Sequence, residues 1–337
     1  MPPVTRYAVH PIAERLAREL DGDVRFDPMT RELFSTDASN YRIVPTGVVF
    51  PKHDDDVRRI VDLTARDQIA LLPRGGGTSL AGQAVGEAVV IDFSKYMNRV
   101  LDVNIEEAWA RVQPGVVLDN FNSFLQSTGF MFGPDVSPSA QATLGGMVGN
   151  NSCGSRSIRY GKMVDHVLEL RGVLESGSAF TFGQLSDDGL AASLRRDDEL
   201  ARIIHAVNDL AVTHHEEIDK RFPKIQRRVA GYNLDELGLR NGFNLAGLLV
   251  GSEGTLAVNT EARVQLVRKP AHAVLGVCHF GGLLEALDTV QHIVRLLPSA
   301  VELVDENVLT LAAAHPDHRS AMRGFVRGAP KALLLVE

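Results

Sequence analysis

Three separated stretches of glycine, hydroxyl and amide residues are the part of this sequence best suited to chemistry. The first is Leu71-Leu-Pro-Arg-Gly-Gly-Gly-Thr-Ser-Leu-Ala-Gly-Gln83, in which a short apolar run gives way to three glycines. Glycine has no Cβ, so its backbone can adopt positive φ and approach a ligand closely. Successive backbone N–H groups in such a turn form a concave site for an anion. Side-chain donors stand around the turn at Arg74, Thr78, Ser79 and Gln83. The stretch therefore predicts a cradle for the diphosphate of a nucleotide cofactor.

Two better-known phosphate motifs do not fit this stretch. A P-loop requires a lysine after its glycines, and none follows here. The dinucleotide fingerprint GxGxxG would require a third glycine where Leu80 stands. Taken alone, the stretch leaves open a glycine-rich loop between strands that binds nothing.

Two further glycine stretches favour the cofactor interpretation. In Pro134-Asp-Val-Ser-Pro-Ser-Ala-Gln-Ala-Thr-Leu-Gly-Gly-Met-Val-Gly-Asn-Asn-Ser-Cys-Gly154, the Thr143 hydroxyl predicts the N-cap of a short helix. The glycines of that helix permit close approach of a ligand. The third stretch, Gly251-Ser-Glu-Gly-Thr-Leu-Ala-Val258, opens an alternating run that predicts a strand through Val267. Together the three loops predict three walls of one large cofactor site.

The elements that must position these loops follow from hydrophobic periodicity. A strand at 47–50, a helix at 53–67 and a strand at 69–72 predict a βαβ unit that delivers the first glycine loop. Further strands are expected at 88–92, 100–103 and 108–112, and a helix at 116–128 closed by Gly129. A hairpin at 167–174 and 179–182 precedes a charged helical stretch over 185–222. An N-terminal helix is expected within 8–20.

The pair Lys269-Pro270 marks a boundary, after which a strand at 274–280, a helix at 283–297 and a strand and helix within 301–314 are expected. The segment Lys331–Glu337 predicts a buried strand whose neighbours would come from another segment, so we expect a fragment or a protein completed by a partner.

Composition excludes several classes of protein. With 337 residues, of which 45 % are hydrophobic, the chain can bury cores for two domains. A net charge of −7 disfavours a nucleic-acid-binding protein, which needs a basic face. No apolar run approaches the roughly 18 residues of a transmembrane helix. Two cysteines are too few for a disulfide framework or for an iron–sulfur cluster, which takes about four thiolates. The expected location is the cytoplasm, with membrane association only through a redox partner.

The motifs PRGGGTS, PDVSPSAQATLGGMVGNNSCG, RYGKMVDHV, GYNLDEL and GSEGTLAV occur in that order from Pro73 to Val258. This order resembles the FAD-binding domain of the vanillyl-alcohol oxidase / p-cresol methylhydroxylase (PCMH) superfamily. Within it the sequence is similar to FAD-linked D-lactate and D-2-hydroxyglutarate dehydrogenases, including glycolate oxidase large-subunit-like proteins. The resemblance runs from about Tyr41 to the end of the chain. It implies an α+β fold in which a two-subdomain PCMH-type FAD-binding domain (41–269) lies between an N-terminal helical segment (1–40) and the start of an α+β substrate domain (270–337).

The resemblance also implies a set of FAD-binding residues. The pyrophosphate would be held by Arg74, Gly75, Gly76, Gly77, Thr78, Ser79 and Gly82. The dinucleotide would be lined by Ser139, Thr143, Gly145, Gly146, Gly149, Asn150 and Ser152, and the flavin or adenine end by Glu253, Gly254 and Val258. The set is completed by Pro73, Gln83, Pro134 and Gly154. Relatives with covalent flavin have a histidine where this chain has Thr78, so non-covalent FAD is expected.

The implied activity is oxidation of a D-2-hydroxy acid, of the D-lactate or D-2-hydroxyglutarate class, to the 2-oxo acid by hydride transfer to flavin N5. The catalytic base is not identified. The candidates for contact with the substrate are Arg228, with Arg227 beside it, and Tyr232. The alternative interpretation is a solvated basic pair on a surface loop for the two arginines and a half-buried packing residue for the tyrosine. Two alternatives stay open: an FAD-dependent oxidase of another alcohol, and a non-catalytic FAD-binding fragment or subunit. An electron-acceptor protein, or an iron–sulfur or C-terminal polypeptide, would be the partner.

The remaining reactive side chains are expected to be structural. His214-His215 and the pair His315 and His318 are interpreted as surface histidines, and no metal site is predicted. Cys153 is interpreted as a small packing residue, and His166 as a residue that caps or packs near the strand after it. For Glu253, an anchor of the glycine turn is favoured over a catalytic carboxylate.

Overall fold

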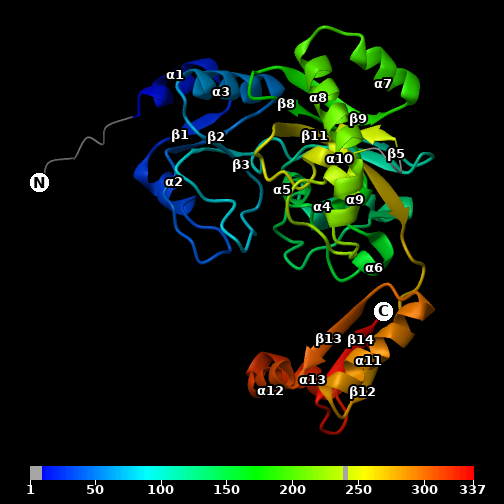
Figure 1. The fold of residues 1–337 in the computed structure, drawn as a ribbon. Coiled ribbons are helices and arrows are strands. Elements are labelled where there is room, and N and C mark those ends of the chain that lie inside the picture. Colours follow the sequence, from blue (N-terminus) through cyan, green and yellow to red (C-terminus); the bar gives the residue numbers. More distant parts are fainter. Residues whose placement is uncertain (1–9, 238–241) are drawn as a thin grey trace, which may run out of the picture.

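The structure, a computed structural model, describes residues 10–237 and 242–337 (Figure 1). Its first sheet has the strand order β1-β2-β4-β3, formed by Asp23–Arg25, Gly47–Phe50, Val89–Asp92 and Leu71–Arg74. Strands β2, β4 and β3 are parallel, and β1 pairs antiparallel with β2. The predicted βαβ unit is confirmed, with β4 inserted between β2 and β3. The first glycine loop therefore leaves the carboxyl end of an edge strand.

Two helices bury their apolar faces beside this sheet. Helix α3 (Asp54–Arg66) begins with three aspartates, whose charge suits the positive end of the helix dipole. The fully buried Ile60 of α3 belongs to one core cluster with Ile12 and Leu16 of α1 (Pro11–Glu19) and with Ile91 of β4. A short helix, α2 (Pro28–Leu33), follows β1. The N-terminal segment thus contributes both a strand and a core helix to this layer.

The second sheet is antiparallel, with the order β10-β9-β8-β11-β6-β5, and β7 pairs with the end of β11. Its strands are β5 (Val100–Asn104), β6 (Trp109–Val112), β7 (Phe130–Phe132), β8 (Val167–Val173), β9 (Ala179–Leu185), β10 (Phe243–Asn244) and β11 (Val258–Arg268). Along β11, residues alternate between buried and partly exposed, so one face is turned to the core.

Helices surround the second sheet and share its core. Phe121 of α4 (Leu118–Leu125) and Met147 of α5 (Leu144–Asn150) belong to the same buried cluster as Val264 of β11. The expected end of the α4 segment at Gly129 is confirmed by its left-handed backbone, with φ of 75°. The expected helical stretch is confirmed as α7 (Asp187–Leu194), α8 (Glu199–Thr213) and α9 (His215–Arg221). Two shorter helices are α6 (Ser157–Tyr160) and α10 (Leu245–Leu249).

The third sheet, formed after residue 270, has the antiparallel order β12-β14-β13. Its strands are β12 (Gly276–Phe280), β13 (Val301–Asp305) and β14 (Ala332–Val336). The expectation that β14 would find its neighbours in another segment is wrong, because both neighbours belong to this chain. Helix α11 (Leu283–Ile293) packs Ala286 against Ala332 and Leu334 of β14. Helix α12 (Glu306–Ala314) contacts β13, and α13 (Pro316–Phe325) contacts α12.

Figure 1 shows this third sheet set apart from the other two and connected to them by the segment after β11. A second link is the ion pair between Arg156 and Glu337, with Nε–Oε1 and Nη2–Oε2 distances of 3.0 and 2.9 Å. Arg156 directly precedes α6, so the pair ties the third sheet to the second glycine stretch. In the described part of the chain, no helix has the length and apolarity to cross a membrane.

Candidate cofactor site

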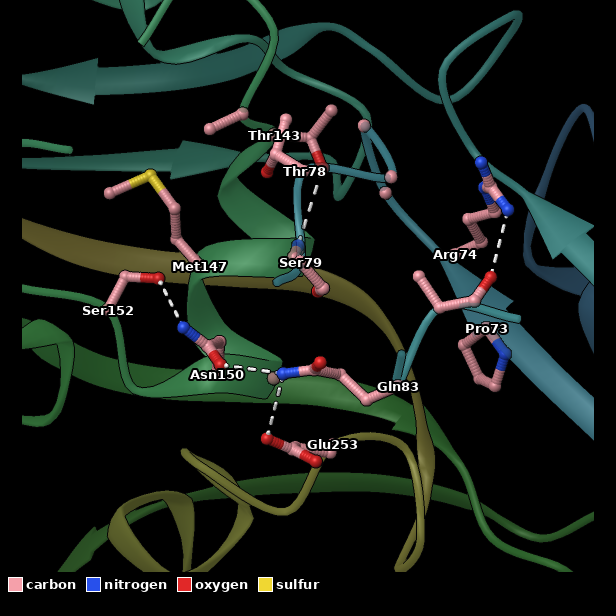
Figure 2. Close-up of a pocket in the computed structure, with 18 of the residues that line it drawn as sticks. Pro73, Arg74, Thr78, Ser79, Gln83, Thr143, Met147, Asn150, Ser152 and Glu253 are labelled. Atoms are coloured by element: carbon pink, nitrogen blue, oxygen red, sulfur yellow. Dashed lines mark hydrogen bonds between the residues drawn. The ribbon is translucent and has the colours of Figure 1, made fainter. Parts of the chain in front are cut away.

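All three predicted glycine loops line one cavity of about 510 Å³ (Figure 2). The first wall is the loop after β3, the second is α5 with the segment before it, and the third is the turn before β11. Protein pockets that hold small molecules typically measure about 300–1,000 Å³. The predicted residues that line the cavity are Pro73, Arg74, Gly75, Gly76, Gly77, Thr78, Ser79, Gln83, Thr143, Gly145, Gly146, Gly149, Asn150, Ser152, Glu253 and Gly254.

Five predicted residues lie outside the cavity lining: Gly82, Pro134, Ser139, Gly154 and Val258. Two of them have packing roles that explain why glycine stands there. A Cβ at Gly82 would lie 2.5 Å from Cδ2 of Tyr41, and one at Gly154 would lie 2.3 Å from the backbone oxygen of Asp135. Val258 is buried as the first residue of β11. Motif membership alone did not separate these residues from those at the cavity.

The first glycine loop is packed tightly against the segment before α5. A Cβ at Gly75 would lie 2.3 Å from Oγ1 of Thr143, and one at Gly76 would lie 2.1 Å from the backbone oxygen of Gln141. Gly77 adopts φ of 64°, which L-residues with a side chain rarely adopt. These glycines are therefore required for the two walls to meet.

Helix α5 presents a bare backbone to the cavity. Thr143 caps it as predicted, because its hydroxyl oxygen accepts a hydrogen bond from the Gly146 amide at 3.3 Å. A Cβ at Gly145 would lie 2.5 Å from Cβ of Pro114, so this glycine serves packing. At Gly146 and Gly149 the nearest atoms to such a Cβ lie 3.4 and 3.8 Å away. The space in front of these two glycines is thus available to a ligand.

Arg74 has a different role from the one that its charge suggested. Its Nη1 donates to the carbonyl oxygens of Ala84 and Phe34 at 2.9 and 3.2 Å, and its Nη2 to that of Thr36 at 2.8 Å. Burial lowers the pKa of this guanidinium, and the nearby Asp92 opposes that shift. The head group thus holds the glycine loop against residues 34–36. Further donors for an anion are available from backbone N–H groups and from hydroxyls such as those of Thr78 and Ser79.

A polar bridge crosses the cavity between its three walls. Gln83 Nε2 donates to Oδ1 of Asn150 at 3.2 Å and to Oε1 of Glu253 at 3.3 Å (Figure 2). The Oε1 atom of Gln83 is buried and has no hydrogen-bond partner within the described residues. Buried polar atoms normally have partners, so this oxygen is an exception beside the cavity. The bare glycines and the hydroxyls of Thr78 and Ser79 fit a ligand that carries phosphate groups.

The structure does not bring the substrate-side candidates to the cavity. Arg228 is only 7 % exposed; its Nη2 is paired with Asp235 and donates to Oδ1 of Asn233 at 3.2 Å. Arg227 donates to the Gly154 carbonyl at 2.8 Å. The Tyr232 hydroxyl lies 2.9 Å from Oγ1 of Thr255. None of the three candidates lines the cavity.

Sequence reasoning missed a mainly apolar part of the lining. It consists of Leu80, Ala81, Ala84, Phe93, Pro114, Val136, Ser137, Pro138, Ala142, Met147, Cys153, Ala257 and Asn259. Many of these residues lie within or beside the predicted loops, so the loops themselves were the available signal. Phe93 and Pro114 come from other turns and carry no motif.

The structural interpretations of the histidines hold. The pairs His214-His215 and His315 with His318 are exposed, and His166 is buried with Nε2 2.5 Å from the Tyr160 carbonyl oxygen. Cys153 lies at the cavity, where burial raises the pKa of its thiol.

Comparison with known proteins shows what the residues around this cavity are similar to. Residues 45–183 match the FAD binding domain family. The chain is 36 % identical over 295 residues to D-2-hydroxyglutarate dehydrogenase of Pseudomonas putida, and 36 % identical over 320 residues to the enzyme of the same name from Escherichia coli. These alignments cover 86 % and 92 % of this chain but 29 % and 31 % of the two relatives. The chain therefore spans less than a third of their length.

Other relatives and solved structures agree. Identity to glycolate oxidase subunit GlcD of Bacillus subtilis is 28 %, over 95 % of this chain and 57 % of that protein. A solved structure of alkyldihydroxyacetonephosphate synthase superposes with a TM-score of 0.66 at 20 % identity, covering all of this chain and 56 % of that one. The expected α+β fold is confirmed by this likeness. Residues 45–183, which contain the first two glycine loops, are therefore similar to the FAD binding domain family.

Proposed function

We propose that this chain is the FAD-binding part of an FAD-dependent D-2-hydroxy-acid dehydrogenase of the D-2-hydroxyglutarate or D-lactate class. One observation carries the proposal: the three loops that line the cavity belong to a chain that is 36 % identical, over most of its length, to D-2-hydroxyglutarate dehydrogenases. When bound, FAD would accept a hydride at flavin N5 from C2 of the hydroxy acid. The protein's own residues bind and orient the cofactor.

We assign the binding of the diphosphate to the backbone of Gly75–Gly77 and to the hydroxyls of Thr78 and Ser79. The bare face of α5 at Gly146 and Gly149 would let the cofactor lie against the helix. Non-covalent attachment is proposed because Thr78 occupies the position at which covalent relatives have histidine. Cys153 supports it, since the raised pKa of its thiol keeps it protonated and a poor nucleophile.

We assign no catalytic base in this chain, because none of the three substrate-side candidates lines the cavity. Residues 41–269 are proposed as the FAD-binding domain and 270–337 as the start of a substrate domain. A second candidate is a non-catalytic FAD-binding subunit, which is favoured by the observation that none of the substrate-side candidates lines the cavity. The proposed partner is an electron-acceptor protein or an iron–sulfur or C-terminal polypeptide, and the proposed location is the cytoplasm.

The test is the visible spectrum of the purified protein before and after denaturation, followed by anaerobic addition of D-lactate or D-2-hydroxyglutarate. A flavin spectrum released by denaturation would support non-covalent FAD. Bleaching by one of the two acids would identify the substrate. Bound flavin that neither acid reduces would instead support the non-catalytic candidate, and a protein that binds no flavin would contradict the proposal.

A further inference from the structure

Asn233 is a buried amide that lies outside the cavity lining and bonds to segments behind two of the cavity walls. It lies between α9 and β10, and its side chain is 0 % exposed. Its Oδ1 accepts hydrogen bonds from Nδ2 of Asn151 at 3.4 Å and from Nη2 of Arg228 at 3.2 Å. Its Nδ2 donates to the carbonyl oxygens of Gly247 and Val250 at 3.2 and 2.7 Å. An amide side chain has two N–H donors and one oxygen with two lone pairs, so the full capacity of this amide is used.

Asn151 connects Asn233 to the second wall of the cavity. It follows the last residue of α5 and adopts φ of 47°, a left-handed conformation that asparagine adopts more readily than most residues. Its Oδ1 accepts a hydrogen bond from the Val164 N–H at 3.0 Å, while its Nδ2 reaches Asn233. The end of α5, where Asn150 and Ser152 line the cavity, is therefore held by Asn233 through a residue that does not line it.

The Nδ2 group of Asn233 makes the connection to the third wall. Gly247 lies in α10, and Val250 caps that helix directly before the turn that forms the wall. The next residue, Gly251, adopts φ of 83°, and its N–H donates to the carbonyl oxygen of Val148 in α5 at 2.9 Å. The turn therefore bonds to α5 directly, and Asn233 adds a second connection between the same two walls.

The surroundings fix both the position and the orientation of this amide. A Cβ at Gly251 would lie 3.2 Å from Cβ of Asn151 and 3.6 Å from Nδ2 of Asn233, so the three residues pack closely. Arg228 is 7 % exposed, and its guanidinium can only donate hydrogen bonds. It therefore requires the oxygen of Asn233 on its side, which leaves Nδ2 facing the two carbonyls. A buried amide whose hydrogen bonds are all made rigidifies the segments that it joins.

We infer that Asn233 is a positioning residue of the cofactor cavity, which together with Asn151 holds α5 and the turn before β11 at the spacing that the cofactor requires. None of the four hydrogen-bond partners of Asn233 lines the cavity, so its loss would displace the walls without removing a contact to the cofactor. A displacement of about 1 Å in a site can cost up to about 100-fold in function. The inference rests on the FAD site of the proposed function.

The test measures FAD affinity, the rate of FAD dissociation and the visible spectrum of bound flavin for the wild-type chain, Asn233→Ala, Asn151→Gly and the double variant. Alanine at position 233 removes all four hydrogen bonds. Glycine at position 151 removes the side-chain bonds and accepts the left-handed backbone there, so this variant decides the test should Asn233→Ala not fold. Asn122→Ala is the matched control, because Oδ1 of Asn122 accepts a hydrogen bond from the Phe132 N–H at 2.8 Å outside the cavity lining. Urea unfolding gives the folded fraction of each variant, so that affinities refer to folded protein.

We expect Asn233→Ala and Asn151→Gly each to weaken FAD binding about tenfold or more, mainly through faster dissociation, and to shift the absorption bands of bound flavin. The double variant should lose little more affinity than Asn233→Ala, because both substitutions remove the same connection. Amide hydrogen exchange should become faster in Asn233→Ala at Gly251 and Glu253, whose N–H groups donate to carbonyls of α5. Asn122→Ala should lower the free energy of unfolding, while the FAD affinity of the folded protein stays within about twofold of the wild type.

A loss of FAD affinity in Asn233→Ala no larger than that in Asn122→Ala would overturn the inference, because Asn233 would then act on stability alone. Losses that add fully in the double variant would also overturn it, as would unchanged amide exchange at Gly251 and Glu253. A wild-type chain that binds no FAD would contradict the proposed function and the inference with it. Bound FAD that no hydroxy acid reduces affects only the proposed reaction.

Discussion

Replacing Gly146 by alanine should separate cofactor binding from stability. The added Cβ would lie 3.4 Å from Oγ1 of Thr143 and 3.8 Å from Cα of Gly75, which the fold can accommodate. Alanine is favoured over glycine in a helix by up to about 1 kcal/mol. The free energy of unfolding should therefore stay level or rise by less than about 1 kcal/mol. The methyl group, however, would occupy the space through which the cofactor approaches α5.

The neighbouring Gly145 is a matched control with the opposite expectation. A Cβ there would lie 2.5 Å from Cβ of Pro114 and 3.0 Å from its Cα and carbonyl oxygen. Since this contact involves backbone that cannot move freely, Gly145→Ala should destabilise the protein by about 1–3 kcal/mol, the usual cost of overpacking. Both substitutions add the same methyl group to the same helix, so their difference reports where the methyl group is directed.

The assay is urea unfolding of the apo-protein combined with an FAD titration followed by flavin fluorescence. We expect Gly146→Ala to retain the wild-type midpoint and lose FAD affinity at least about tenfold, which corresponds to 1.4 kcal/mol of binding free energy. Gly145→Ala should lower the midpoint. If Gly146→Ala bound FAD as tightly as the wild type, the assignment of the cofactor to the bare face of α5 would be refuted.

Three other perturbations test the surrounding structure. Burial raises the pKa of the Asp92 carboxyl above its usual 3.8 in the folded protein, so this carboxyl ionises at lower pH in the unfolded chain. The free energy of unfolding of the wild type should therefore fall as pH rises from 3.8 through the folded-state pKa. Asp92→Asn should lack this decline and gain stability relative to the wild type as pH rises above 3.8, as measured by urea unfolding. Parallel pH profiles would contradict the burial argument. Asn233→Ala should cost about 1–3 kcal/mol in the same assay, because its Nδ2 donates to the Gly247 and Val250 carbonyls at 3.2 and 2.7 Å and these would lose their partner. Arg156→Gln removes a partly exposed ion pair and should change the free energy of unfolding by less than about 1 kcal/mol. Amide hydrogen exchange should become faster at Ser299, because its N–H donates to the Glu337 carbonyl. Unchanged exchange would show that the ion pair does not hold this end of the third sheet.

Local elements could be predicted from the sequence because their signals are local. The strand Gly47–Phe50 was predicted residue for residue, since an apolar run is bounded there by polar and turn-forming residues. The Thr143 cap followed from a hydroxyl residue before a helical stretch. Strand β7, three residues long, was not predicted, because its pairing with the end of β11 depends on residues more than a hundred positions away. The neighbours of β14 were misjudged for the same reason.

The candidate site was predictable where glycine and hydroxyl residues cluster, and not where side chains come from elsewhere. The charge of Arg74 suggested a phosphate ligand, but the sequence does not show that the carbonyls of Phe34, Thr36 and Ala84 surround its guanidinium. The pairing of Arg228 with Asp235 was likewise not predictable, because it depends on how the intervening turn folds. Residue type predicts which chemistry is available, whereas the tertiary fold decides which partner uses it.

The strand order β12-β14-β13 has a consequence for how the third sheet forms. Strands β12 and β13 do not pair with each other, because each pairs along its length with β14. Strand β14 begins about 27 residues after the end of β13 and more than 50 residues after the end of β12. During synthesis, the first two strands must therefore wait with open edges until residues 332–336 have left the ribosome. Pairings between residues far apart in sequence also close slowly. Until then the exposed strand edges and the face of α11 that carries Ala286 are available to chaperones, so this sheet is the part of the chain whose folding we expect to depend most on the rate of translation.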